Sequence, residues 1–485
     1  MLTQSLLFAV KGIKANTTAF GRVTHFLETA EPLIVMAGVA FLVVLLVLAL
    51  MGRRLELTFL MLMACSMSAV AIVWLDTGST VARFILIGLL AVNAPRFLAV
   101  PKVPLAFFWL YVIIGASMTI FSPVITWTVQ WAALLTGVGL VGIALTDYAR
   151  DRKAITRLCI AFLLVAAVWG SVGSVTVGKL AKEDEGGQRF TGHTSNPGTF
   201  TQTGGILLPF AVWGAMRPWA KKWRFLCGML AIGMAIVLIA SAQRTGTFAG
   251  AIGCIPLLAR RDARQLLVGL LVVGTVALLA YQLSSLNQRH TAFILKRYLD
   301  DDSSGRTTIW ANAIEKLMQN PILGKGFGAN KYFRRQLEHG THNGYLSIWY
   351  DTGILGLLAF LAANAAAAWC AFTAILNARD VETSNLARLV LGVLICVGLC
   401  GATTQGAASP SDLSTCALLI MLVLSAQIAV IARDERLRPA VSPVVPWAYR
   451  RYPGALQPAA RGAYFPAPAG RYAVMRAPRP PLRSS

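Results

Sequence analysis

Residues 302–346 read DSSGRTTIWANAIEKLMQNPILGKGFGANKYFRRQLEHGTHNGYL, a polar and basic stretch in an otherwise apolar chain. Across all 485 residues, 56% are hydrophobic and only 13% are charged. Apolar runs long enough to cross a bilayer recur on both sides of this stretch. Because lipid cannot satisfy irregular backbone, such runs must be helical. The sequence therefore predicts an all-α, polytopic integral membrane bundle with one large insert.

The apolar runs predict about 12–13 transmembrane helices, the length of each being close to the ~20 residues that span a bilayer. We expect them at 32–51, 56–74, 81–99, 105–121, 126–146, 156–178, 203–216, 223–241, 245–259, 265–282, 347–376, 386–402 and 413–432. The predicted organisation is an N-terminal interfacial segment (1–31), a bundle in two parts (32–282 and 346–432), an insert (283–345) and a tail (433–485). The first 30 residues do not have the pattern of a cleavable signal peptide, since no basic region precedes their short apolar run.

The short loops alternate in charge. Loops such as 150–157 and 217–224 are rich in Lys and Arg, whereas 74–80, 121–125 and 403–412 contain neither. The positive-inside rule assigns the basic set to the cytoplasm. It follows that the insert lies on the far side of the membrane, and that the tail is cytoplasmic.

The net charge of +23 does not indicate nucleic-acid binding, because much of it comes from the tail. Residues 433–485 are rich in Pro, Ala and Arg, a composition typical of a disordered segment that rests on anionic lipid headgroups. The 8 cysteines all fall in or beside apolar segments, so we expect small buried side chains. Cys396 and Cys400 share a helix face, but no histidine or acid nearby suggests a metal site.

Two short outer segments carry isolated arginines. QRFTGHTSNPGTF, residues 188–200, contains Arg189 among turn-forming residues. SAQRTGTFAG, residues 241–250, places Arg244 between two apolar spans with almost no loop. Each arginine has an ordinary explanation, as a solvated loop residue or as a side chain that reaches the interface. An arginine that faces a polar cavity would instead indicate a functional site.

The insert combines a helix, a glycine-rich turn and two histidines. SSGRTTIWANAIEKLMQN predicts an amphipathic helix capped by Ser304, with one apolar stripe formed by Ile309 or Trp310, Ala313 or Ile314, and Leu317. PILGKGFGAN ends that helix; it lacks the preceding strand and following Lys-Ser/Thr of a phosphate-binding loop, so it does not predict a nucleotide site. His339 and His342 lack a matching carboxylate cluster, so no metal site is predicted.

Several motifs together resemble the O-antigen ligase and O-antigen polymerase superfamily. They are Gly-Arg-x-x-x-Trp at 305–310, Pro-x-x-Gly-x-Gly-x-Gly at 321–328, and His-Asn-x-Tyr-Leu at 342–346, followed by Gly353 and Gly356. The Arg-Phe-Thr-Gly…Asn-Pro stretch at 189–197 and the Arg244 junction also look like that family. The resemblance implies a GT-C-like membrane glycosyltransferase of about twelve spans with both ends cytoplasmic, to which segment 32–51 is an addition.

The resemblance also implies a chemistry. Such enzymes transfer glycan from undecaprenyl diphosphate to a hydroxyl acceptor, without a metal or other cofactor. Arginine suits a diphosphate leaving group because its forked donors stay charged. We therefore assign diphosphate binding to Arg189, Arg244 and Arg306, with Arg306 also catalytic. His342 fits a general base for the acceptor hydroxyl, with Glu338 or Asp351 as the alternatives. The expected supporting residues are Asn343, Tyr345 and Asn196.

These features predict a multi-pass protein of the bacterial inner membrane whose partners are a lipid-linked glycan donor, a glycan or lipid A-core acceptor, and membrane lipids. The Gly-Arg-x-x-x-Trp and His-Asn-x-Tyr-Leu blocks favour polymerisation of O-antigen or exopolysaccharide repeats. Ligation onto a lipid A core is the alternative. A lipid-linked oligosaccharide flippase would also be polytopic, but it would not require the large outer insert.

Overall fold

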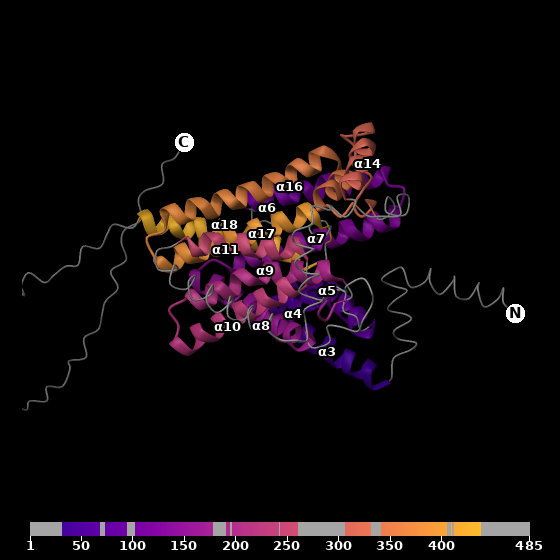
Figure 1. Ribbon diagram of the computed structural model, residues 1–485. Coiled ribbons are helices and arrows are strands. Elements are labelled where there is room, and N and C mark those ends of the chain that lie inside the picture. The colour runs from indigo at the N-terminus through magenta and orange to yellow at the C-terminus, as the bar shows by residue number, and fades with distance from the viewer. Residues whose placement is uncertain are drawn as a thin grey trace, which may run out of the picture. The chain divides into compact units, whose positions relative to one another are not determined.

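The computed structural model describes residues 32–67, 73–94, 102–177, 191–194, 196–241, 243–259, 306–330, 341–404, 409 and 412–437. Across these residues the chain is helical and contains no β-strand. The helices are α3 (Pro32–Leu50), α4 (Arg54–Ser66), α5 (Val73–Val92), α6 (Val103–Ser117), α7 (Ile125–Tyr148), α8 (Arg152–Val177), α9 (Pro197–Met216), α10 (Lys221–Ala240), α11 (Arg244–Leu258), α14 (Arg306–Gln319), α16 (Gly344–Asn377), α17 (Val381–Thr403) and α18 (Leu413–Leu437), with a 3₁₀ turn, η1, at Met118–Phe121. Figure 1 shows their arrangement.

This architecture confirms the predicted class of a polytopic helical membrane protein. Among the described residues, 7 helices are long and apolar enough to cross a membrane. The predicted spans that fall on described residues overlap helices, with two differences: the span predicted at 56–74 covers α4 and the start of α5, and α5 begins and ends earlier than the predicted span 81–99. The span predicted at 265–282 lies outside the described residues, as do the segment 1–31 and residues 438–485.

The interior of the bundle is built around α18. Nearly every residue from Leu413 to Gln427 is buried, which is expected for a helix apolar on all sides and surrounded by others. Its neighbour α16 buries a stripe of small residues, namely Ala359, Ala363, Ala367, Ala371 and Ala374. Large apolar side chains on α16, such as Leu358 and Trp369, are exposed. Small residues inside and large apolar residues outside are typical of helices that pack closely within lipid.

Glycines set the relative directions of three helices. Gly246 of α11 packs against Thr201 of α9, and Gly250 packs against Gly205, so α9 and α11 run in the same direction. In contrast, Gly253 of α11 meets Gly392 of α17 at a point where a Cβ on Gly392 would lie 2.0 Å from the Gly253 carbonyl oxygen. The Arg388 guanidinium donates to the Pro256 carbonyl oxygen at 3.1 Å. Arg388 is four residues before Gly392 on α17, whereas Pro256 is three residues after Gly253 on α11. Helix α17 is therefore antiparallel to α11.

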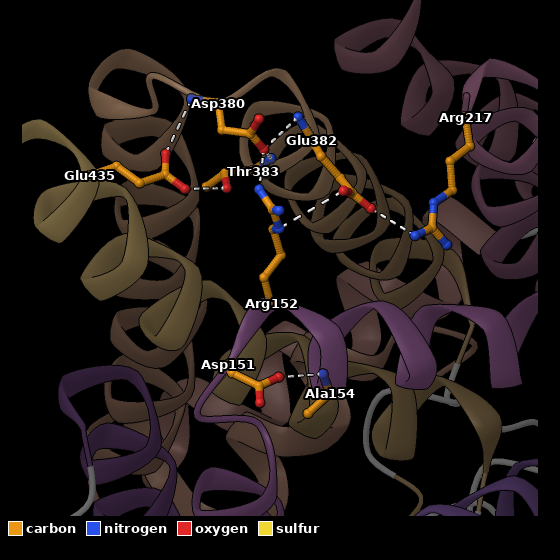
Figure 2. A network of polar contacts seen from close by, with 8 residues as sticks. All are labelled: Asp151, Arg152, Ala154, Arg217, Asp380, Glu382, Thr383 and Glu435. Atoms are coloured by element: carbon orange, nitrogen blue, oxygen red, sulfur yellow. Dashed lines mark hydrogen bonds and ion pairs between the residues drawn. The ribbon is translucent and has the colours of Figure 1, made fainter. Parts of the chain in front are cut away.

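A polar network joins four helix ends (Figure 2). Arg152, at the start of α8, pairs with Asp380 and Glu382 at the start of α17. Arg217, after the end of α9, pairs with Glu382 at 2.7 Å. Near the end of α18, the Glu435 carboxylate accepts hydrogen bonds from the Asp380 backbone N–H at 3.2 Å and the Thr383 hydroxyl at 2.6 Å. The starts of α8 and α17 thus lie at the same end of the bundle as the ends of α9 and α18.

Candidate functional site

Helix α16 is broken at Gly353, close to its start. Gly353 has φ 68° and ψ 179°, values that interrupt the helix. A positive φ is accessible to glycine at little cost. The space is equally restrictive, because a Cβ at this position would lie 2.0 Å from the Ile322 carbonyl oxygen. The break separates a short segment, 344–352, from the long part of the helix that lies along α6 (Figure 1).

The glycine-rich turn of the insert binds to this break. Lys325 and Gly326 donate their backbone N–H groups to the carbonyl oxygens of Tyr350 and Asp351, at 3.0 and 2.8 Å. In the opposite direction, Ile354 donates its N–H to the Pro321 carbonyl oxygen at 3.0 Å. The broken helix and the turn therefore satisfy each other's backbone groups, as buried non-helical backbone requires.

The Asp351 side chain completes this connection. Its carboxylate is 2% exposed and accepts three hydrogen bonds: from the backbone N–H of Gly328 at 2.9 Å, from that of Asn330 at 2.9 Å, and from the Asn330 side-chain amide at 2.8 Å. This geometry gives Asp351 a positioning role in the turn. It does not favour the alternative in which Asp351 takes the acceptor's proton, because the carboxylate is buried and engaged.

The turn also inserts an aromatic side chain into the bundle. Phe327 is 1% exposed and packs edge-on against Tyr111 of α6, with ring centroids 5.3 Å apart. It occupies the space above Gly115, where a Cβ would lie 2.1 Å from the ring. Edge-to-face contacts of this kind add to the stabilisation from burial. The insert is thus anchored within the helices rather than resting on their surface.

His342 lies in a constrained turn just before α16. It has φ 47°, and among the described residues it is the only non-glycine with positive φ. Both neighbours are fixed. The Asn343 side chain caps α16 by accepting from the backbone N–H groups of Tyr345 and Leu346, at 3.0 and 3.1 Å, and the buried Thr341 hydroxyl lies 2.9 Å from that of Ser347. The His342 side chain itself is exposed. Left-handed backbone at a non-glycine residue is uncommon and clusters at functional sites.

Arg306 is linked to this turn through α14. It is the first residue of that helix and is half-buried. One turn further along, the Trp310 indole N–H donates to the Thr341 carbonyl oxygen at 2.8 Å. Residues four apart share a helix face, so Arg306 lies on the face that joins the His342 turn. The predicted amphipathic helix is confirmed, with Ala313 and Leu317 as its buried residues. Ser304 lies outside the described residues.

Arg244 begins α11 at the same end of the bundle. Arg244 lies nine residues before Gly253 on α11, which is about 13 Å along the helix axis at ~1.5 Å per residue. Because Gly253 contacts Gly392 and the two helices are antiparallel, Arg244 is level with the end of α17. The Tyr345 hydroxyl donates to the Gly398 carbonyl oxygen near that same end, at 2.9 Å. Arg244 is half-buried. The starts of α11 and α16 therefore flank the end of α17.

Asn196 belongs to the same end. Its side chain accepts from the Gly198 N–H at 2.7 Å and caps α9, which begins beside α11 because Thr201 packs against Gly246. Three helices, α9, α11 and α16, thus begin at the end that holds Arg244 and His342. Helix N-termini and arginines both favour anions, so this end suits a phosphorylated ligand. Arg189, Glu338 and His339 lie outside the described residues.

A polar pocket of about 290 Å³ lies next to the glycine-rich turn. Its lining includes amines, amides and a phenol, contributed by Lys316, Gln319, Asn320, Lys325 and Tyr350. These groups donate and accept hydrogen bonds in the manner that hydroxyl-rich ligands require. The end of the bundle with His342 therefore offers a second polar surface beyond the predicted residues.

Three residues at or near this end were not assigned their structural roles from the sequence. Arg83 is 5% exposed inside α5, where it donates to the Ser79 carbonyl oxygen at 3.2 Å. His193 packs edge-on against Phe200, and its two ring nitrogens are buried without a hydrogen bond of normal geometry to a described residue. Asp351, above, is the third. For Arg83 and Asp351 the available signal was a lone ionisable residue within an apolar run.

Burial lowers the pKa of His193 below its ordinary value, and the nearby Ser66 backbone opposes this shift more weakly. His193 is therefore held neutral at neutral pH. It lies in the loop that precedes α9, close to Ser66 at the end of α4.

Comparison with known proteins gives a matching family model and distant solved structures, one of which is described below. No curated protein matches the chain. A chain from a solved structure described as "Structural coordination of polymerization and crosslinking by a peptidoglycan synthase complex" is 18% identical, with a TM-score of 0.37 over 71% of this chain and 100% of that chain, a likeness too distant to support an argument. Residues 229–361 match the family described as "Wzy_C: O-Antigen ligase". The match supports an activity of the O-antigen ligase or polymerase type. It confirms the resemblance predicted from the motifs, and the matched region is the part of the chain that carries Arg244, Arg306 and His342.

Proposed function

We propose that this protein transfers glycan from undecaprenyl diphosphate to a hydroxyl acceptor at the periplasmic face of the bacterial inner membrane. The observation that carries the proposal is the His342 turn. Its strained backbone is held by Asn343, Thr341 and Trp310, at the end of the bundle where Arg244 and three helix N-termini gather. A base and a set of cations at one end are what such a transfer needs.

The transfer proceeds by displacement at the anomeric carbon of the donor sugar. His342 removes the proton from the acceptor hydroxyl, whose oxygen then forms the new bond to that carbon. The bond between the carbon and the diphosphate oxygen breaks, and the diphosphate leaves with the bonding electrons. Arg244, Arg306 and Arg189 bind it and stabilise the developing charge, since guanidinium groups form paired, charge-assisted hydrogen bonds. In this scheme the arginines supply the positive charge, and no divalent ion is required.

We further propose that the acceptor is a growing glycan, so that the enzyme polymerises O-antigen or exopolysaccharide repeats. Ligation onto a lipid A core is the alternative. The test is a strain from which the gene is deleted. If long glycan disappears while core-linked single repeats persist, the enzyme is a polymerase; if core-linked single repeats disappear as well, it is a ligase. Unchanged surface glycan would contradict both.

The biochemical test uses purified protein with a lipid-linked oligosaccharide donor, in the presence of a chelator. Formation of longer lipid-linked products, with release of undecaprenyl diphosphate, is the expected result. Loss of activity on chelation would contradict the metal-independent scheme. Translocation of donor between leaflets without any transfer would instead indicate a flippase.

A further inference from the structure

An apolar groove of about 1000 Å³ lies between α8 and α10, away from the His342 turn. Most of its lining is apolar or small, with Leu163 and Gly170 on α8, Leu226, Leu230 and Gly233 on α10, and Trp219 before α10 among its residues. Several of these side chains, including Leu226 and Met229, are exposed in the isolated chain. The groove is therefore an apolar surface that the isolated chain leaves uncovered.

The groove is as long as one leaflet of a bilayer. Leu163 of α8 lies near Cys227 of α10, since both contact Gly214. Further along both helices, Gly170 of α8 faces Leu230 and Met234 of α10. The two helices therefore run parallel along the groove. From Trp223 to Met234 it extends about 16 Å at ~1.5 Å per residue, close to half of the ~30 Å hydrocarbon core. A partner helix would cross the full thickness of the membrane. The length fits the acyl chain of a lipid in a single leaflet.

One end of the groove carries indoles and a cation. Trp219 and Trp223 line this end, and the Lys222 amine lies 5.6 Å from the centre of the Trp223 ring. Lys222 is exposed and stands one helical turn before Leu226, on the groove side of α10. Indoles with basic residues at the end of an apolar surface are typical of the interface with anionic headgroups.

We propose that this groove is a binding site for one anionic phospholipid. An acyl chain lies along α8 and α10, and the phosphate is bound by Lys222 beside the two indoles. This site is separate from the proposed donor site. Helix α10 starts just after α9 ends, whereas Arg244 lies where α9 begins, so the two sites are at opposite ends of the bundle.

Two glycines on α10 provide a matched pair of variants. Gly233 lines the groove and Gly228 does not, yet a Cβ at either position would meet no atom within 4 Å. Gly233→Leu should place a side chain in the groove, and Gly228→Leu makes the same change five residues away. Protein stripped of copurified lipid would be mixed with phosphatidylglycerol or phosphatidylcholine of identical acyl chains, and bound lipid counted by native mass spectrometry. We expect wild type and Gly228→Leu to retain phosphatidylglycerol in preference to phosphatidylcholine, and Gly233→Leu to lose that retention.

A charge variant tests the headgroup separately, and it remains informative if Gly233→Leu fails to fold. Lys222→Glu should lower phosphatidylglycerol retention about fivefold or more, the effect of one basic residue at an anionic surface. Arg433→Glu, an exposed arginine on α18, makes the same charge change away from the groove and should retain the lipid. Equal retention of both lipids by wild type, or equal retention by the Gly233 and Gly228 variants, would overturn the proposal. So would a copurified protein in place of lipid.

Discussion

The Trp310 indole N–H donates a 2.8 Å hydrogen bond to the carbonyl oxygen of Thr341, the residue before His342. This bond joins the helix that begins at Arg306 to the turn that carries the proposed base. A change in one of these two elements is therefore transmitted to the other, and the predictions for Arg306 and His342 must be tested with folding controls.

Replacing His342 should abolish transfer while leaving the turn intact, if the new residue tolerates left-handed backbone. Asn does so more readily than most residues but cannot act as a base at neutral pH. We expect His342→Asn to lose about 100-fold or more in rate, within the range that a general base contributes, and His342→Gln to behave similarly. The measurement is turnover of lipid-linked donor by purified protein. A His342→Asn protein that keeps most of its activity would show that the imidazole only holds the turn.

The rate of glycan transfer should depend on the arginine side chains themselves and not on positive charge alone. Arg244→Ala and Arg306→Ala are each expected to reduce transfer by about 100-fold or more, the typical loss when one donor to a developing charge is removed. Lys should restore little, because a point charge lacks the fork of donors. Glu315→Ala, an exposed residue on the same helix as Arg306 but outside the polar pocket, is the control and should keep its activity. Full activity of Arg306→Ala at normal protein level would remove Arg306 from the site.

Asp351→Asn should loosen the glycine-rich turn. The amide has one acceptor oxygen where the carboxylate has two, so at least one buried N–H of Gly328 or Asn330 loses its partner. An unsatisfied buried group costs about 1–3 kcal/mol. The apparent melting temperature in detergent should fall, and activity should fall with it. Glu315→Gln removes an exposed negative charge from α14 and should do neither. An unchanged melting temperature in Asp351→Asn would show that these bonds contribute little.

His193 should make the protein less stable in acid. Its pKa is lowered by burial, so the folded protein holds it neutral at pH values where the unfolded chain binds a proton. The contribution of neutral His193 to the free energy of unfolding is fully present above about pH 6.5, the ordinary pKa of histidine. It is lost as the pH falls toward the lowered pKa of the folded protein. His193→Phe should reduce the fall in apparent melting temperature between pH 7.5 and pH 5. An identical fall in both proteins would assign acid sensitivity to other groups.

The orientation of the chain is also testable. The alternation of charged loops predicts that residues near 320 are periplasmic and residues near 450 cytoplasmic. Alkaline phosphatase fused near residue 320 should be active, and the same enzyme fused near residue 450 should be inactive, with a fluorescent protein giving the reverse pattern. A cytoplasmic signal at 320 would exclude the proposed site, because lipid-linked glycans would then be on the opposite side.

The sequence predicted the helices well because membrane spans depend on local composition. Asn196, Asn343 and Asp380 each cap a helix, as short polar side chains before apolar runs indicate. It could not predict the break in α16, because Gly353 resembles the other glycines in apolar helices. Nor could it predict that Asp351 faces the turn, or that His342 has left-handed backbone. Both depend on contacts between segments that are separate in the sequence.

The reciprocal bonds between the glycine-rich turn and the broken helix have a practical consequence for anyone who wishes to study the insert alone. The turn donates to Tyr350 and Asp351, and it places Phe327 against Tyr111 on a helix more than two hundred residues earlier in the chain. A soluble fragment cut at the ends of the insert would lack those acceptors and that aromatic neighbour. We therefore expect such a fragment to be unable to fold by itself, so that antibodies or binders raised against it would fail to recognise the intact enzyme.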